Sequence, residues 1–222
     1  MPETYYKILN ENGSCYHSGI GRWHLPTANK PGKWMPRIKG PLALCKNGYH
    51  ILRADQLVLW LGPAIFTVEP KGKIVHDTEK SVCEQARLLT RLTAWNDRTA
   101  RLFGADCAEH VLPIFQKHFP DDMRPALAIA AARAFADGRI TRDELDAARA
   151  AARAAAWDAS WAARAAARAA AWDAAWAARA AARAAAWAAA QDAAWAADWA
   201  AARAAETEWQ TTRLLEYLKV VR

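Results

Sequence analysis

The sequence predicts an α+β protein that is mostly helical, and three observations predict it. Residues 1–76 hold short apolar segments separated by Gly, Pro and Asn, a pattern typical of strands and turns. In residues 77–140 apolar side chains recur at spacings of three and four, the period of a helix. Residues 141–222 are rich in alanine and contain neither Gly nor Pro, which favours a helix. We therefore expect a small β-rich domain, a helical domain and one long helix with these bounds.

The β-rich region begins with a hairpin signal. Residues 5–9 and 14–17 flank Asn12-Gly13, and both turn residues accept a positive φ. A segment rich in Gly and Pro follows. After it we expect a strand at 49–52, a short helix at 54–61 and a second strand at 64–68. A turn at Lys71-Gly72 would then let residues 73–76 pair back with the preceding strand.

The middle region is expected to consist of helices. Asp77 or Thr78 can cap a helix that begins near Glu79, and Gly104 marks a break or a kink. The residues that would share one face of this helix are Val82, Ala86, Leu89, Leu92, Trp95, Thr99 and Leu102.

The later helices carry clear start and stop signals. Pro125 fits the first turn of a helix that Gly138 ends. Thr141 and Glu144 form a capping box, in which each side chain accepts the backbone N–H of the other residue. We expect one uninterrupted helix from Thr141 to about Leu218, with a length of roughly 117 Å.

An Arg–Arg–Trp–Trp stripe that repeats every fifteen residues runs along this helix. Its members, which share one side of the helix, are Arg149, Arg153, Trp157, Trp161, Arg164, Arg168, Trp172, Trp176, Arg179, Arg183, Trp187, Trp195, Trp199 and Arg203. Trp and Arg are frequent at interfaces, so the stripe predicts a homo-oligomer, as in a coiled coil, or a surface for a protein partner. The alternative is packing against the chain's own helices, including a hairpin that breaks near residues 188–192.

The net charge of +7 lies mainly at the front of the chain. Residues 1–140 hold 19 Lys and Arg against 13 Asp and Glu, whereas residues 141–222 hold 11 against 10. This surplus is consistent with an anionic partner such as a nucleic acid, although a surface of mixed charge is the commoner case. The four cysteines form no C-x-x-C pair, which favours reduced thiols. The sequence shows no signal peptide and no membrane span, so we expect a cytoplasmic protein with no membrane partner.

Motifs of the common enzyme classes are absent from the sequence, and we expect a non-enzymatic protein with no cofactor and no metal site. Residues 48–69, read as strand, short helix and strand, nevertheless resemble in outline the core of ADP-ribosyltransferase-like folds. In such folds a His on one strand helps to hold NAD, so the resemblance implies His50 and Glu69 as ligand-binding residues. An ADP-ribosyltransferase-like enzyme, or an NAD- or nucleotide-binding domain, is therefore the alternative.

Two further stretches resemble known families. Residues 44–50 and 66–69, which read LCKNGYH and FTVE, resemble an uncharacterised N-terminal domain found in bacterial and phage proteins. Residues 106–115 and 119–125, which read DCAEHVLPIF and FPDDMRP, resemble immunity proteins of bacterial toxin systems, and the likeness covers about 85–180. That resemblance implies an inhibitor that acts by protein contact and has no catalytic residues.

The leading hypothesis is thus a non-enzymatic immunity or antagonist protein of a bacterial or phage conflict system, which binds a toxin or a defence component. A second alternative is a phage factor with an anti-defence role, which would bind an anionic nucleotide or a nucleic acid through the basic N-terminal half.

Overall fold

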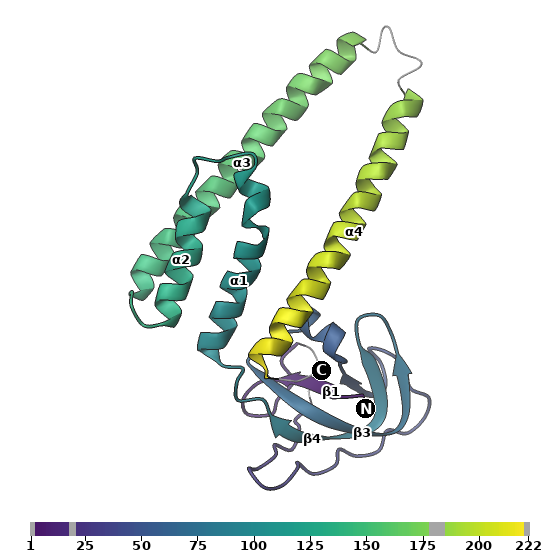
Figure 1. The fold of residues 1–222 in the computed structure, drawn as a ribbon. Helices are drawn as coiled ribbons and strands as arrows, with labels where there is room; N and C mark the ends of the chain where they lie inside the picture. The colour runs from purple at the N-terminus through teal and green to yellow at the C-terminus, as the bar shows by residue number, and fades with distance from the viewer. Residues whose placement is uncertain (1–2, 18–20, 178–184, 220–222) are drawn as a thin grey trace. The chain divides into compact units, whose positions relative to one another are not determined.

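The structure is a computed structural model that describes residues 3–17, 21–177 and 185–219, with side chains outside residues 160–200. Its elements are β1 Tyr5–Leu9, β2 Tyr49–Ile51, the 3-10 helix η1 Ala54–Leu59, β3 Ala64–His76, β4 Ser81–Arg91, α1 Asp97–Gln116, α2 Arg124–Ala136, α3 Arg142–Ala177 and α4 Ala185–Tyr217 (Figure 1). The chain is therefore α+β, with the strands in its N-terminal part, as predicted. It divides into a sheet unit, Met1–Phe103 with Thr207–Arg222, and a helical unit, Gly104–Glu206.

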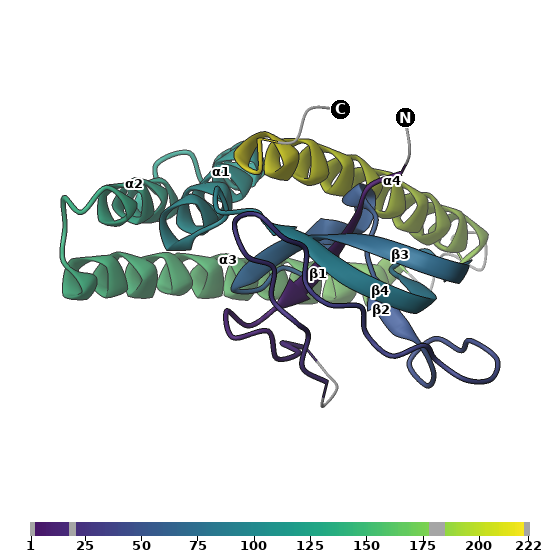
Figure 2. The same ribbon diagram turned by 90° about the horizontal axis from the view of Figure 1, so that it is seen from below.

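The sheet is antiparallel and has the strand order β1-β3-β4-β2. β3 and β4 form a long hairpin, visible in Figure 2, whereas β1 and β2 pair with it from distant parts of the sequence. The side chains of Leu9, Ile51, Phe66 and Leu88 are almost fully buried and form the centre of the core. The Gly- and Pro-rich segment at 32–38 lies along β4, because its backbone N–H groups donate to carbonyl oxygens of that strand.

The prediction of a turn at Lys71-Gly72 is wrong, because β3 continues through these residues to His76. The pairing with β4 shifts its register between Lys71 and Ile74, and Gly72 has a φ of +84°. A glycine at positive φ is the usual residue of a β-bulge, so the local signal was real but belongs to a bulge within a strand.

The helix expected to begin near Glu79 is also wrong, since residues 81–91 form β4. Asp77, taken as a helix cap, instead belongs to the hairpin turn: its carboxylate accepts the N–H of Thr78 at 2.8 Å, and its N–H donates to the Lys80 carbonyl at 3.0 Å. The apolar residues of this segment fit a helix period and are also compatible with a buried strand. Pairing with β2 and β3 decides between the two, and that pairing is not a local property.

Gly104 does not break the first helix, because α1 is continuous from Asp97 to Gln116. Asn96 caps it, since its side-chain oxygen accepts the N–H groups of Arg98 and Thr99 at 3.1 and 3.2 Å. A glycine inside a helix lowers the stability of the helix by only about 1 kcal/mol relative to alanine. The neighbouring helical turns can offset a loss of this size.

The signals for the later helices are confirmed. Pro125 lies in the first turn of α2, and Gly138 follows α2 with a φ of +70°. The N–H of Thr141 donates to the Glu144 carboxylate at 2.7 Å, and the N–H of Glu144 donates to the Thr141 hydroxyl at 3.3 Å. These bonds complete the capping box at the start of α3. The backbone N–H and the hydroxyl of Thr141, which both donate to the Glu144 carboxylate, lower the pKa of Glu144.

The expectation of one straight helix from Thr141 to Leu218 is wrong. The ring of Tyr217, at the end of α4, lies 6.2 Å from that of Phe103 in α1. From Phe103 to Arg142 the chain spans at most about 90 Å, even with extended loops, whereas a straight helix would place Tyr217 about 110 Å from Arg142. The structure describes α3 and α4 on either side of residues 178–184, which lie outside the described residues. A break near 188–192 is wrong as well, because α4 is helical there.

The end of α4 is part of the core of the sheet unit. Leu214 and Leu215, near the end of α4, and Leu218, directly after it, are exposed by 3% or less. The Phe103 ring that Tyr217 contacts also packs edge-on against Trp95, at 6.1 Å. The two chain segments that border the helical unit therefore meet in one apolar cluster.

Candidate functional site

The helical unit is built on the packing of α2 against the first half of α3 (Figure 1). The buried side chains of this pair are Ile129, Leu145 and Ala155. At the connection between the helices, the Arg142 guanidinium lies 5.7 Å from the centre of the Phe135 ring, an arrangement that gives a cation–π contact.

Arg124 joins the start of α2 to the middle of α3. Its guanidinium lies 2.7 Å from the Asp122 carboxylate and 2.9 Å from that of Asp158. Hydrogen bonds to the two carboxylates raise the pKa of Arg124, and the bond from Arg124 lowers the pKa of Asp122. Asp122 also accepts the backbone N–H of Arg124 at 3.1 Å. The FPDDMRP stretch thus fixes the position of α2 on α3.

Asp106 has a similar role between α1 and α2. Its carboxylate is 8% exposed and lies 2.9 Å from the guanidinium of Arg133, which also reaches Glu109 at 2.5 Å. Removal of one partner from such a buried pair is costly, because it leaves a charge without compensation. The DCAEHVLPIF stretch therefore contributes a structural ion pair to the helical unit.

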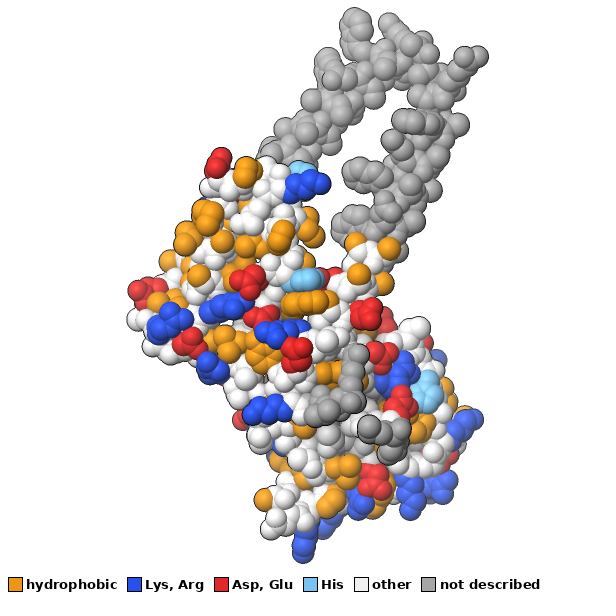
Figure 3. Space-filling model, viewed as in Figure 1, with side chains coloured by type: hydrophobic (Ala, Val, Ile, Leu, Met, Phe, Trp, Pro, Cys, Tyr) orange, Lys and Arg blue, Asp and Glu red, His pale blue; other side chains and the backbone are white. Residues whose placement is uncertain are grey.

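Large apolar side chains are exposed on the same helices. Met123, Leu127 and Trp157 are exposed by 52%, 61% and 63%, and we call these three residues the apolar face. The N–H of Leu127 donates to the Met123 carbonyl, so the two residues lie one helical turn apart. Arg124 follows Met123 in the sequence and Asp158 follows Trp157, and the ion pair between Arg124 and Asp158 brings these two segments together. In Figure 3, hydrophobic side chains gather over these helices.

α1 also carries exposed apolar side chains, Val111 and Ile114, which are exposed by 39% and 69%. Five of the eight large hydrophobic side chains that are exposed in the described part of the chain therefore belong to the helical unit. Apolar residues gathered in this way are typical of a surface that another molecule covers.

The predicted Arg–Trp stripe is described only at its ends. Arg149, Arg153 and Trp157 are exposed on α3, and Arg203 is exposed on α4. The side chains of Trp161, Arg164, Arg168, Trp172, Trp176, Arg179, Arg183, Trp187, Trp195 and Trp199 lie outside the described ones. The stripe as an interface thus stays a prediction.

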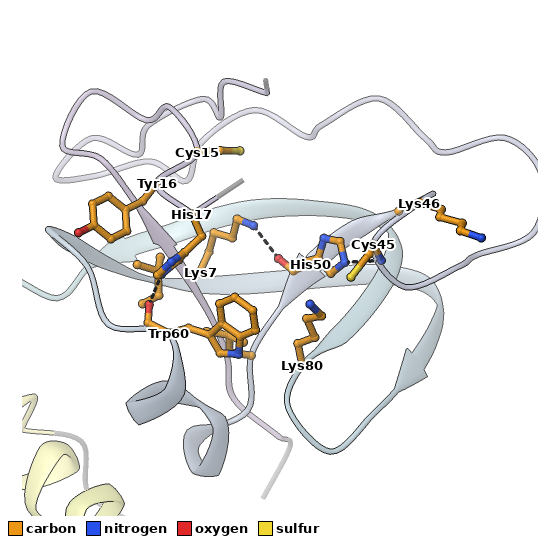
Figure 4. Close-up of a pocket in the computed structure, with 12 residues that line it drawn as sticks. Lys7, Cys15, Tyr16, His17, Cys45, Lys46, His50, Trp60 and Lys80 are labelled. Atoms are coloured by element: carbon orange, nitrogen blue, oxygen red, sulfur yellow. Dashed lines mark hydrogen bonds between the residues drawn. The ribbon is translucent and has the colours of Figure 1, made fainter. Parts of the chain in front are cut away.

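The two residues predicted to bind a ligand lie in different surroundings in the sheet unit. His50, on β2, lines a cavity of about 400 Å³ (Figure 4). Glu69, on β3, does not line it, and its carboxylate accepts a hydrogen bond from Arg87 at 2.6 Å. Lys7, Trp60 and Lys80 also line the cavity. None of the three was predicted as a site residue, because they lie far apart in the chain.

His50 is neutral at physiological pH. Burial, followed by the nearby charges of Lys7 and Lys80, lowers its pKa to about 4. Its Nε2 atom accepts the backbone N–H of Cys45 at 3.0 Å, which leaves Nδ1 as the protonated nitrogen. The imidazole thereby fixes the loop at Cys45, a non-glycine residue with a φ of +61°.

The lowered pKa of His50 predicts a loss of stability in acid. An unfolded His has a pKa of about 6.5, so below that pH the unfolded chain binds a proton that folded His50 rejects until about pH 4. Between pH 7 and 5 the loss should be about 1 kcal/mol, after allowance for partial exposure. Thermal unfolding of His50→Gln should then depend less on pH than that of the wild type. His24→Gln, at an exposed position, is the control, and equal pH dependence in both variants would contradict this account.

Among residues 3–17, 21–177 and 185–219, no group of three His, Cys, Asp or Glu side chains is placed to hold a metal ion. The described helices also include none that is long and apolar enough to cross a membrane.

Comparison with known proteins gives one family. The model of the family described as "Imm-5 like putative immunity protein" matches residues 91–217. No curated protein and no solved structure matches the chain. The matched segment begins at the last residue of β4 and ends at the last residue of α4, so it contains the α-helices α1 to α4 of the described part of the chain. It covers more than half of the sequence, and the chain belongs to the Imm-5 like putative immunity protein family.

Proposed function

We propose that this chain is an immunity protein that neutralises a protein toxin by binding it through the apolar face of α2 and α3. The observation that carries the proposal is the exposure of Met123, Leu127 and Trp157, by 52–63%, within the segment that matches the immunity family. An inhibitor that acts by contact needs apolar anchors at the centre of its interface, and Trp is prominent among such anchors.

The surroundings of the apolar face suit a binding surface. Arg124 and Asp158 form an ion pair beside it, and Asp122 holds the same guanidinium. Apolar anchors with a charged rim are the usual composition of a protein interface. Because the ion pairs and the helix packing fix the backbone, little conformational entropy would be lost on binding.

The partner that fits is a toxin of a bacterial or phage conflict system, encoded beside the chain's gene or delivered by a competitor. Support comes from the family and from the apolar face together. Neither the family match nor the face depends on the cavity of the sheet unit, so this function can be tested without reference to that cavity.

The test is a protection assay. Cells that express the neighbouring toxin should grow when they also express the wild-type chain. Leu127→Asp places a charge in the apolar face and should weaken toxin binding by about 100-fold or more, so growth is lost. The matched control is Leu59→Asp, at a position of the sheet unit that is 51% exposed, and it should protect like the wild type. Full protection by Leu127→Asp, or none by the wild type, would refute the proposal.

A further inference from the structure

The cavity of the sheet unit has a volume of about 400 Å³ and is built from segments far apart in the sequence. β1 contributes Lys7, the loop before β2 contributes Cys45, and β2 contributes His50. Trp60 follows η1, and Lys80 lies in the turn between β3 and β4. Figure 4 shows Lys7, His50, Trp60 and Lys80 around one space.

The charges around this cavity are all positive among the described residues. Its lining includes Lys7, Lys46 and Lys80 and no Asp or Glu. Lys7 Nζ lies 2.9 Å from the His50 carbonyl oxygen, and Figure 4 shows the Lys80 side chain directed toward the same histidine. Both charges contribute to the lowered pKa of His50. Lys7 itself has a lowered pKa, mainly because it is desolvated, and an anion beside it would offset that cost. Lys46, by contrast, lies apart from the other labelled side chains in Figure 4.

The positions of these groups are fixed by hydrogen bonds. Lys7 Nζ donates to the His50 carbonyl at 2.9 Å, and the indole N–H of Trp60 donates to the Glu79 carbonyl at 2.9 Å. His17 Nε2 lies 2.6 Å from the Trp60 carbonyl oxygen, and Lys80 Nζ lies 4.6 Å from the centre of the Trp60 ring. The cavity is thus held in shape by the fold, as in ligand sites that are largely formed before binding.

We propose that this cavity binds a small phosphate monoester of mononucleotide size, with the phosphate between Lys7 and Lys80 and the base near Trp60. Two converging ammonium groups match the double negative charge of a phosphate monoester, and the Nδ1–H of neutral His50 adds a donor. A volume of about 400 Å³ is near the lower end of the range for ligand pockets, which suits a mononucleotide better than a dinucleotide.

The basic character of the sheet unit would also attract such a ligand from solution. Residues 1–103 hold 15 Lys and Arg against 8 Asp and Glu, whereas residues 104–222 hold 15 of each. The whole net charge of the chain therefore lies on the segment that builds the cavity. Since this surplus would bind any anion weakly, the test must separate the cavity from the rest of the basic surface.

The test is calorimetric titration of the full chain with adenosine monophosphate at pH 7 and moderate salt. Saturable binding of one nucleotide per chain is expected, with much weaker binding of adenosine, which lacks the phosphate. Lys80→Met should weaken nucleotide binding about ten-fold or more, and Lys80→Arg should retain most of it.

The matched control is Lys73→Met, which removes the same charge from an exposed position of the same hairpin. Its affinity should stay within about two-fold of the wild type, and the thermal unfolding of each variant checks that it is folded. Absence of nucleotide binding, equal binding of adenosine, or an equal loss in Lys73→Met and Lys80→Met would overturn the proposal. None of these results would bear on toxin neutralisation, which depends on the helical unit.

Discussion

Replacement of Leu214 by alanine is expected to destabilise the sheet unit by about 2–5 kcal/mol. Leu214 lies near the end of α4 and is fully buried, although that helix is rich in alanine and its described side chains before Glu206 are exposed. The substitution would replace the buried isobutyl side chain by a methyl group and leave a cavity in the core. Urea unfolding followed by near-ultraviolet circular dichroism measures the loss.

Leu59→Ala is the matched control for this prediction, because the same atoms are removed from a side chain that is 51% exposed. Its effect should stay within about 0.5 kcal/mol, as is usual for surface positions. If Leu214→Ala were as mild as Leu59→Ala, the end of α4 would not be part of the core of the sheet unit.

Leu145→Ala is expected to have an effect of similar size, about 2–5 kcal/mol, on the helical unit. Leu145 follows the capping box of α3 and is fully buried. Because Ala155 and Ile129 are the other buried side chains among the described residues of α2 and α3, few described apolar groups remain to compensate its loss. Far-ultraviolet circular dichroism should record the unfolding of the helices at a lower urea concentration.

Leu127→Ala, on α2, is the control for Leu145, since its side chain is 61% exposed. It should leave the stability within about 0.5 kcal/mol of the wild type, while it weakens toxin binding. A large loss of stability in Leu127→Ala would mean that this side chain serves packing, and the apolar face would lose its central residue.

Local features of the fold could be predicted from the sequence because a few neighbouring residues determine them. The capping box of Thr141 and Glu144, the glycine that ends α2 and the strands at β1 and β2 are of this kind. β4 could not be predicted in the same way. Val82 and Ala86 are compatible with both a helix and a strand, and the choice depends on β2 and β3.

The return of α4 to the sheet unit left a signal that could have been used. Leu214, Leu215 and Leu218 follow the alanine-rich segment, which ends at Ala205, and such large apolar residues near the end of a helix indicate a core. No local signal marks the ligand cavity, however, because Lys7, Trp60 and Lys80 are brought together only by the sheet. His50 was found because it lies on a recognisable strand, whereas Met123 and Leu127 could not be told from buried residues without the packing of α2 on α3.

The most direct test of the proposed function is hydrogen–deuterium exchange of the full chain with and without its toxin. Toxin binding through the apolar face should slow exchange at the start of α2, around Met123 and Leu127, and on α3 around Trp157. The amides of β1 to β4 should exchange as in the free chain. Slower exchange confined to the sheet unit, or no change within residues 104–159 at saturating toxin, would contradict the account.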